Sequence, residues 1–120
     1  KEWVQTAIPN TDIYARRPLV TTLSGATETI NPHVAYDQYL LKCSNASGMT
    51  ITLNADGTFD GNEIKSITFI QDGVGQLTFA DGTVTIKTAE TKKTRKQYSM
   101  VTAIWTGTNE VYLTGDLELA

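Results

Sequence analysis

The sequence is poor in the residues that small domains use for covalent or metal-based stabilisation. It has one cysteine, one histidine and three prolines in 120 residues. The lone cysteine, Cys43, excludes an internal disulfide, and a chain of this length can bury a sufficient core without one. We therefore expect one domain held together by packing, with no structural metal and no cofactor, made in a reducing cytosol.

Positive charge and long apolar runs are also scarce. Ten Lys and Arg residues stand against 13 Asp and Glu, which gives a net charge of −3 and a pI near 5.0. Binding to phosphates needs a basic face, so nucleic acid is excluded as a partner class. No stretch approaches the roughly 18 apolar residues of a membrane span, and no secretion signal is present, which predicts no membrane insertion. The chain starts at Lys1 without an initiator Met, and we interpret it as a piece whose upstream domains are missing.

Apolar residues alternate with polar ones along most of the chain, whereas helical spacing is missing. This pattern predicts an all-β protein, and the number of short strands favours an antiparallel β-sandwich of the jelly-roll kind. The turn at Asp81-Gly82 predicts a hairpin between the strands on either side of it. The expected strands cover residues 19–23, 27–31, 37–44, 49–53, 64–71, 76–80, 83–88, 98–105 and 110–114.

Three segments have a character of their own. Residues 98–105, YSMVTAIW, carry apolar side chains on both faces, which predicts a central, well-buried strand. Residues 1–18 have weak periodicity and predict an extended connector ahead of a single domain at 19–120. Residues 87–97, KTAETKKTRKQ, hold five of the ten basic residues, and we interpret them as a solvated loop in preference to an anion-binding or partner-binding patch.

The stretch IQDGVGQLTFADGTVTI, residues 70–86, superficially resembles a calcium loop. An EF-hand needs oxygen ligands at its first and third positions and a glutamate at its twelfth. With Gly73 as the loop glycine, these positions fall on Thr68, Ile70 and Phe79, so the ligand set fails. We predict two turns around a short strand, with Gly75 at a close backbone approach or at positive φ.

The remaining polar residues give no pattern that indicates catalysis. His33 stands alone, without the serine, cysteine or carboxylate neighbours of a triad, and Cys43 lies in a predicted strand, where packing is the simpler role. Asp56, Asp60 and Glu63 would be the ligands of an irregular calcium site. The stronger interpretation is that these carboxylates have their ordinary role in turns. We therefore predict a protein without enzymatic activity.

From about residue 36 onward, four blocks resemble a β-structured module that recurs at the C-terminal end of tail fibres, tailspikes and related virion proteins of tailed bacteriophages. The blocks are LLKC with SGMTITL at 40–53, ITFIQDGVGQLTF at 67–79, KTRKQYSMV at 93–101 and NEVYLTGDL at 109–117. Two positions depart from the family pattern, because Asn54 stands where proline is common and Tyr112 where tryptophan is frequent. The resemblance covers about two thirds of the chain.

The resemblance implies a virion component that forms a homotrimer, is joined to upstream domains and works on a bacterial surface. The expected function is binding of a host receptor, either a surface polysaccharide or an outer-membrane protein, together with trimer assembly. The alternative is a purely structural trimerisation or capping domain, or a capsid decoration protein. An enzyme that acts on polysaccharide is the weakest alternative within these residues.

Candidate binding residues follow from the chemistry of sugar recognition. Aromatic rings stack on the CH groups of a pyranose, and polar loop residues hydrogen bond to its hydroxyls. The aromatic candidates are Trp3, Tyr36, Tyr39 and Tyr112, whereas Trp105 is expected in the core. The polar candidates are Asp56, Asn62, Asn109 and Glu110.

Overall fold

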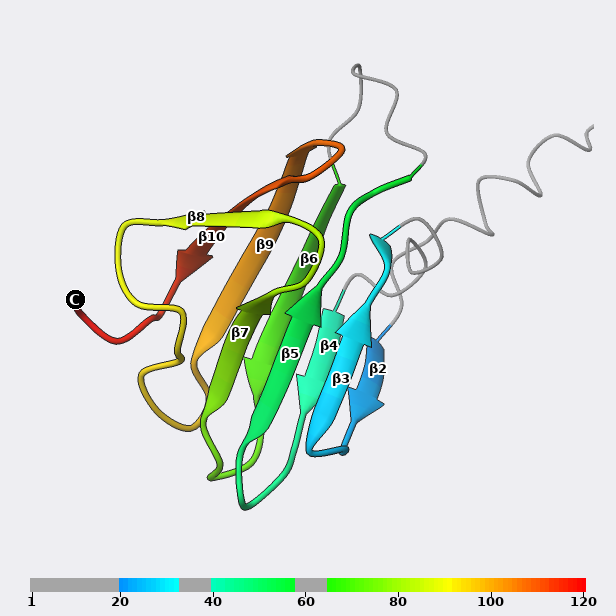
Figure 1. Ribbon diagram of the computed structural model, residues 1–120. Coiled ribbons are helices and arrows are strands. Elements are labelled where there is room, and N and C mark those ends of the chain that lie inside the picture. The colour runs from blue at the N-terminus through cyan, green and yellow to red at the C-terminus, as the bar shows by residue number, and fades with distance from the viewer. Residues whose placement is uncertain (1–19, 33–39, 58–64) are drawn as a thin grey trace, which may run out of the picture.

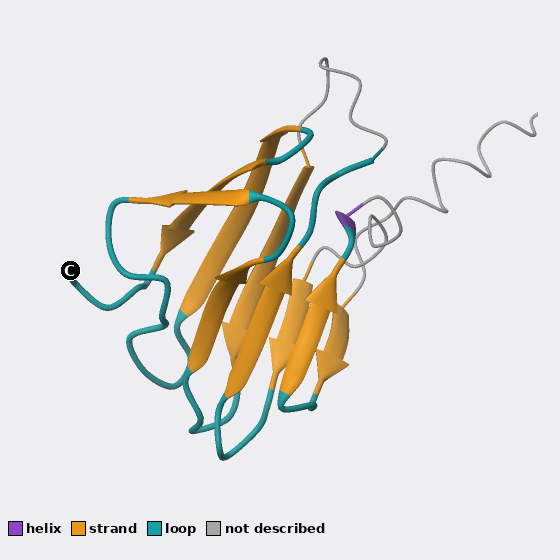
Figure 2. Ribbon diagram, viewed as in Figure 1, coloured by secondary structure: helices purple, strands orange, loops and turns teal. Residues whose placement is uncertain are grey.

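The computed structural model describes residues 20–32, 40–57 and 65–120. All elements of four or more residues in these ranges are β-strands, so the predicted all-β class is confirmed (Figures 1 and 2). Each of the predicted strands overlaps an observed one, whereas the predicted connector at 1–18 lies outside the described residues. The strands are β2 (Val20–Leu23), β3 (Thr27–Ile30), β4 (Leu40–Cys43), β5 (Met49–Leu53), β6 (Lys65–Gln71), β7 (Leu77–Asp81), β8 (Thr85–Thr88), β9 (Met100–Gly107) and β10 (Glu110–Gly115).

The strands form two sheets that face one another. One sheet has six strands in the order β2-β4-β6-β9-β10-β8, and the other has three in the order β3-β5-β7. Figure 1 shows the three-stranded sheet lying in front of β2, β4 and β6. Because both sheets direct apolar side chains inward, the core lies between them.

The pairs β2-β3, β4-β5 and β6-β7 are three successive strand-turn-strand units, which we call rungs. Each rung crosses from one sheet to the other and stacks on the next, so β2-β4-β6 and β3-β5-β7 are parallel. This is the arrangement of a short solenoid. The predicted antiparallel, jelly-roll pairing is therefore wrong for these strands. An alternating pattern fits parallel and antiparallel neighbours equally, so the sequence pattern did not distinguish them.

The turns at one end of the rungs are fitted to one another. The side-chain amide of Asn45, in the second turn, donates to the carbonyl oxygen of Ser24 in the first turn at 3.0 Å. In the third turn, a Cβ added to Gly75 would lie 1.9 Å from the carbonyl oxygen of Asn45. The prediction of a close backbone approach at Gly75 is confirmed, and the reason is the stacking of one turn on the next.

The C-terminal part completes the larger sheet. Strands β9 and β10 form the predicted antiparallel hairpin, and β9 lies between β6 and β10 as a central strand. The predicted hairpin at Asp81-Gly82 is wrong, because β8 pairs in parallel with β10 and not with β7. The edge of β7 is taken by the later segment around Lys93, where the backbone amide of Phe79 donates to the carbonyl oxygen of Lys92 at 2.8 Å.

Aromatic residues from both sheets anchor the core. The rings of Phe69 on β6 and Phe79 on β7 meet edge to face with their centroids 5.2 Å apart, a favoured geometry for aromatic pairs. The indole of Trp105 is fully buried and donates its Nε1–H to the carbonyl oxygen of Asn54 at 2.9 Å. The expectation that Trp105 belongs to the core is confirmed.

Candidate functional site

The eight candidate binding residues separate into three groups. Trp3, Tyr36, Tyr39 and Asn62 lie outside the described residues. Asp56 is fully buried, and one of its carboxylate oxygens lies 3.4 Å from Nζ of Lys65. The prediction that Asp56 offers hydrogen bonds from an exposed loop is therefore wrong, because the segment after β5 packs against the β9–β10 turn, where the Asp56 amide donates to the carbonyl oxygen of Thr108.

The remaining candidates, Asn109, Glu110 and Tyr112, come together at one end of the six-stranded sheet. The parallel pairing of β8 and β10 sets Lys87 opposite Tyr112. Nζ of Lys87 lies 3.1 Å from Oε2 of Glu110 and 5.5 Å from the centroid of the Tyr112 ring. We call Lys87, Glu110 and Tyr112 the corner cluster. Lys87 was missed from the sequence, because it belongs to the segment interpreted as a solvated loop.

The corner cluster carries a compensated pair of charges beside an aromatic ring. The hydrogen bond with Lys87 lowers the pKa of Glu110, and Tyr112 adds to the effect. The same hydrogen bond raises the pKa of Lys87. Both groups therefore stay ionised across the neutral range, while the Tyr112 side chain is half exposed. Stacking of the Tyr112 ring on a sugar stays a prediction. In the structure, the ammonium group of Lys87 lies against this ring.

The outward face of the six-stranded sheet is partly apolar. Met100 on β9 is opposite Ile70 on β6, and Ile104 on β9 is opposite Tyr112 on β10. Met100 is 50% exposed, although it lies on a central strand. The hydroxyls of Thr68 and Thr102 hydrogen bond to each other between these two apolar pairs at 2.9 Å. The described residues of this sheet thus bury apolar side chains on the face toward the core and carry further apolar side chains on the outward face.

Tyr98 differs from its prediction. The strand expected to begin at 98 begins at Met100, and Tyr98 lies outside it with a 68% exposed side chain. Its φ of 73° is in the left-handed region, which is uncommon for a residue other than glycine. The backbone amide of Tyr98 donates to the carbonyl oxygen of Gln71 at 2.6 Å, and this bond fixes the backbone at Tyr98 against the end of β6. Tyr98 therefore adds an exposed aromatic side chain two residues before the start of β9.

The basic segment 87–97 packs against the domain over part of its length, which corrects its interpretation as a solvated loop. Thr94 is fully buried, and its hydroxyl donates to Oε1 of Gln71 and accepts from the amide of Leu77. Three of the five cations pair with carboxylates, since Lys87 binds Glu110, Lys92 binds Asp81 and Arg95 binds Asp116. Most of the positive charge is therefore compensated locally.

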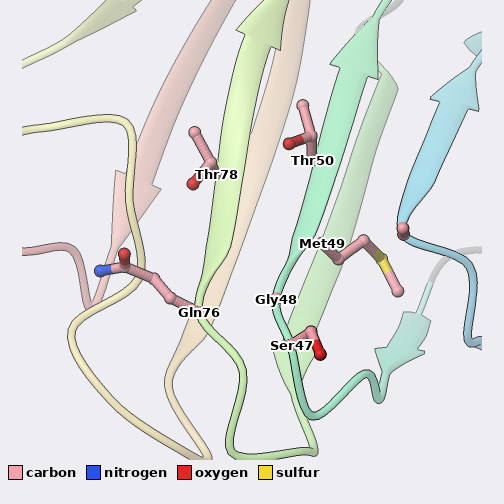
Figure 3. A pocket seen from close by; sticks show the side chains of 7 residues that line it. Ser47, Gly48, Met49, Thr50, Gln76 and Thr78 are labelled. Atoms are coloured by element: carbon pink, nitrogen blue, oxygen red, sulfur yellow. The ribbon is translucent and has the colours of Figure 1, made fainter.

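The outward face of the three-stranded sheet is lined by threonine. The pairing register aligns Thr27, Thr50 and Thr78 in one row across the rungs and Thr29 with Thr52 in a second row. A groove of about 400 Å³ opens beside the first row (Figure 3). It is lined by Ala26, Ser47, Gly48, Met49, Thr50, Gln76 and Thr78.

Groups for metal binding or nucleophilic chemistry are not assembled in the described residues. Ranges 20–32, 40–57 and 65–120 contain no cluster of three or more His, Cys, Asp or Glu side chains that could hold a metal ion. Burial raises the pKa of the Cys43 thiol to about 12, so the reactive thiolate is suppressed. Over the same ranges, no helix has the length and apolar character to span a membrane.

No protein-family model, curated protein or solved structure matches the chain significantly.

Proposed function

We propose that this chain is a non-enzymatic module of a phage virion, the C-terminal domain of a tail fibre or tailspike that assembles as a homotrimer and attaches to the bacterial surface. The four sequence blocks that resemble such modules motivate the identity. The observation that carries the assembly role is the apolar outward face of the six-stranded sheet. We call this surface the assembly face; its apolar residues are Val20, Leu40, Ile70, Met100, Ile104 and Tyr112.

Five of the six apolar residues of the assembly face lie on inner strands of the sheet, and Val20 lies on the edge strand β2. Antiparallel sheets that face water on one side carry polar residues there. On β9, Met100 and Ile104 point away from the core, whereas Val101, Ala103 and Trp105 point into it. The apolar pairs Ile70–Met100 and Ile104–Tyr112 flank the hydroxyl pair of Thr68 and Thr102, and exposed apolar side chains gathered on one face of a soluble protein are typical of a contact surface. Packing against other copies covers this face and accounts for the two-faced pattern of the strand.

A homotrimer also supports attachment. Three copies of a weak receptor site act together, and linked sites gain avidity without new contacts. The receptor is expected to be a surface polysaccharide or an outer-membrane protein. The alternative function is purely structural, a trimerisation or capping domain or a capsid decoration protein, in which the same assembly face serves without a receptor.

Sedimentation velocity at micromolar concentration tests the assembly role. The chain is expected to sediment as a trimer, and the double variant Met100→Lys/Ile104→Lys as a folded monomer, because two buried cations have no partner at the interface. Thr29→Lys, on the outward face of the other sheet, is the matched control and is expected to remain trimeric. A monomeric wild-type chain, or a trimeric double variant, would overturn the proposal.

Attachment is tested separately by binding of the trimer to whole bacteria and to a glycan array. Binding to cells supports a receptor role. A stable trimer that binds neither cells nor glycans would favour the purely structural alternative.

A further inference from the structure

We propose that the threonine rows and the groove beside them are a binding site for an uncharged, linear polysaccharide that runs across the rungs. The inference rests on the proposed attachment function, and it specifies both the site and the ligand class. The site lies on the outward face of the three-stranded sheet, on the other side of the two-sheet stack from the assembly face. A trimer built through the assembly face therefore leaves this surface open.

The hydroxyls of the site are available for a ligand. Within the described ranges, no hydrogen bond engages the side-chain hydroxyl of Ser47, Thr50 or Thr78. Figure 3 shows Thr50 and Thr78 side by side on neighbouring strands and Ser47 at the turn that precedes the strand of Thr50. Elsewhere the protein does satisfy such groups internally, as at Thr68 and Thr102, whose hydroxyls pair at 2.9 Å. The groove thus offers donors and acceptors that the fold itself does not use.

Gln76 lines one end of the groove, and its amide extends toward the segment beside β7 (Figure 3). Its Nε2 donates to the carbonyl oxygen of Thr94 and to Oε2 of Glu118, both at 2.8 Å. These two bonds orient the amide and engage the nearby carboxylate of Glu118. Within the described ranges, Oε1 of Gln76 has no donor, so it is left as an acceptor for a ligand hydroxyl.

The periodicity of the site favours a linear repeating ligand. In-register parallel strands place equivalent side chains about 4.8 Å apart, which is comparable to one sugar unit of an extended polysaccharide. The row of Thr27, Thr50 and Thr78 therefore presents one hydroxyl and one methyl to each of three successive units. Threonine has a stiff side chain, so this array is ordered before the ligand binds, which reduces the entropic cost of binding.

The absence of charge selects the ligand class. None of the residues that line the groove carries a formal charge. Two formal charges of opposite sign stand at its edge, because Lys93 forms a bridge with Thr78 and the carboxylate of Glu118 accepts from Gln76. An anionic polysaccharide would lose hydration here for one counter-charge close to a carboxylate, whereas a neutral one exchanges water hydrogen bonds for those of the array.

Titration calorimetry with defined hexasaccharides tests the site. The probes are neutral hexamers of glucose, mannose and N-acetylglucosamine, with hexagalacturonate as the anionic comparison. At least one neutral hexamer is expected to bind. Thr50→Val and Thr78→Val, which keep the shape and remove the hydroxyl, are each expected to weaken binding about fivefold. Thr108→Val, at an exposed position of the turn between β9 and β10, is the matched control and is expected to bind like the wild type.

Three results would overturn the inference: tighter binding of the anionic hexamer, equal loss in the Thr108→Val control, or no binding of any neutral hexamer. Sedimentation of the same samples separates these failures from failure of the proposed function. A trimer that attaches to bacteria but binds no neutral hexamer rejects this site alone. A chain that neither trimerises nor attaches rejects the proposed function.

Discussion

Gly75 lies against the backbone of Asn45, in the neighbouring turn, with no room for a side chain. An added Cβ would come within 1.9 Å of the Asn45 carbonyl oxygen and 2.2 Å of the Gly48 amide nitrogen. Both groups are backbone, so relief of the clash requires the two turns to separate. The stacking of the second and third rungs thus requires glycine at position 75.

Gly75→Ala is therefore expected to lower the free energy of unfolding by about 3 kcal/mol, the upper range for a single substitution. Urea denaturation followed by circular dichroism measures the change. Gly57→Ala is the matched control, because an added Cβ at Gly57 meets nothing within 4 Å; its expected effect is within about 0.5 kcal/mol. Equal stability of the two variants would contradict the close approach of the turns.

Asn45→Ala tests the link between the first and second turns. The Asn45 side chain donates to the carbonyl oxygen of Ser24 at 3.0 Å and accepts from the amide of Ser47 at 2.9 Å. Loss of both bonds is expected to lower the free energy of unfolding by about 1 to 2 kcal/mol. Asn45→Asp keeps the acceptor for Ser47 but sets a carboxylate oxygen against the Ser24 carbonyl oxygen in place of the donor, so it is expected to be destabilised as well. An alanine variant as stable as the wild type would show that these bonds do not hold the turns together.

The bidentate pair between Arg95 and Asp116 predicts a stability that depends on pH. The Asp116 carboxylate accepts from Nε of Arg95 at 2.7 Å, from Nη2 at 3.0 Å and from the Ser99 hydroxyl at 2.9 Å. The hydrogen bonds from Arg95, then Ser99, lower the pKa of Asp116. Since the folded state favours the ionised form, this stabilisation is present at neutral pH and is lost as the pH falls through the folded pKa, below about pH 4.

Asp116→Asn removes the group that titrates. The variant is expected to be less stable than the wild type at pH 7, and the difference should shrink as the solution is acidified below about pH 4. Urea midpoints of both proteins across this pH range measure it. A difference that stays constant from neutral to acidic pH would indicate that the carboxylate charge of Asp116 does not contribute.

The Cys43 thiol is expected to be inert in the folded protein. It is fully buried on β4, and burial, with a smaller contribution from Glu28, raises its pKa to about 12. At pH 8 an aromatic disulfide reagent should leave the native chain unlabelled and label it fully in urea, because the thiolate is the reactive form. Rapid labelling of the native protein would show that β4 opens readily.

The strands were predictable because alternation and turn residues act locally. Met49, Ile51 and Leu53 point inward while Thr50 and Thr52 point outward, as the pattern of the segment predicts. Trp105 in the core and the tight approach at Gly75 also followed from the sequence. These features depend on the two-residue period of a strand and on the chemistry of glycine, which are properties of a few neighbouring residues.

The rungs were missed because their spacing is irregular. Leu40 pairs with Val20, 20 positions earlier, and with Thr68, 28 positions later, so the sequence shows no fixed repeat. The corner cluster was partly anticipated, in that two of its members, Glu110 and Tyr112, were candidates. Lys87 joins them only because β8 pairs with β10, a contact across 23 positions in the chain. Asp56 was misplaced because burial of a turn carboxylate depends on what packs over the turn.

The sequence by itself determined the all-β class, the positions of the strands and the two-faced pattern of β9, since side-chain alternation is set by the backbone geometry of each strand. Only the tertiary structure decided that the rungs stack in parallel, that β8 joins β10, and that the threonines of three separate strands align into rows. These outcomes depend on which strand edges meet. Parallel and antiparallel ladders both satisfy the backbone donors and acceptors of a strand, although with different hydrogen-bond patterns, so packing between distant segments makes the choice.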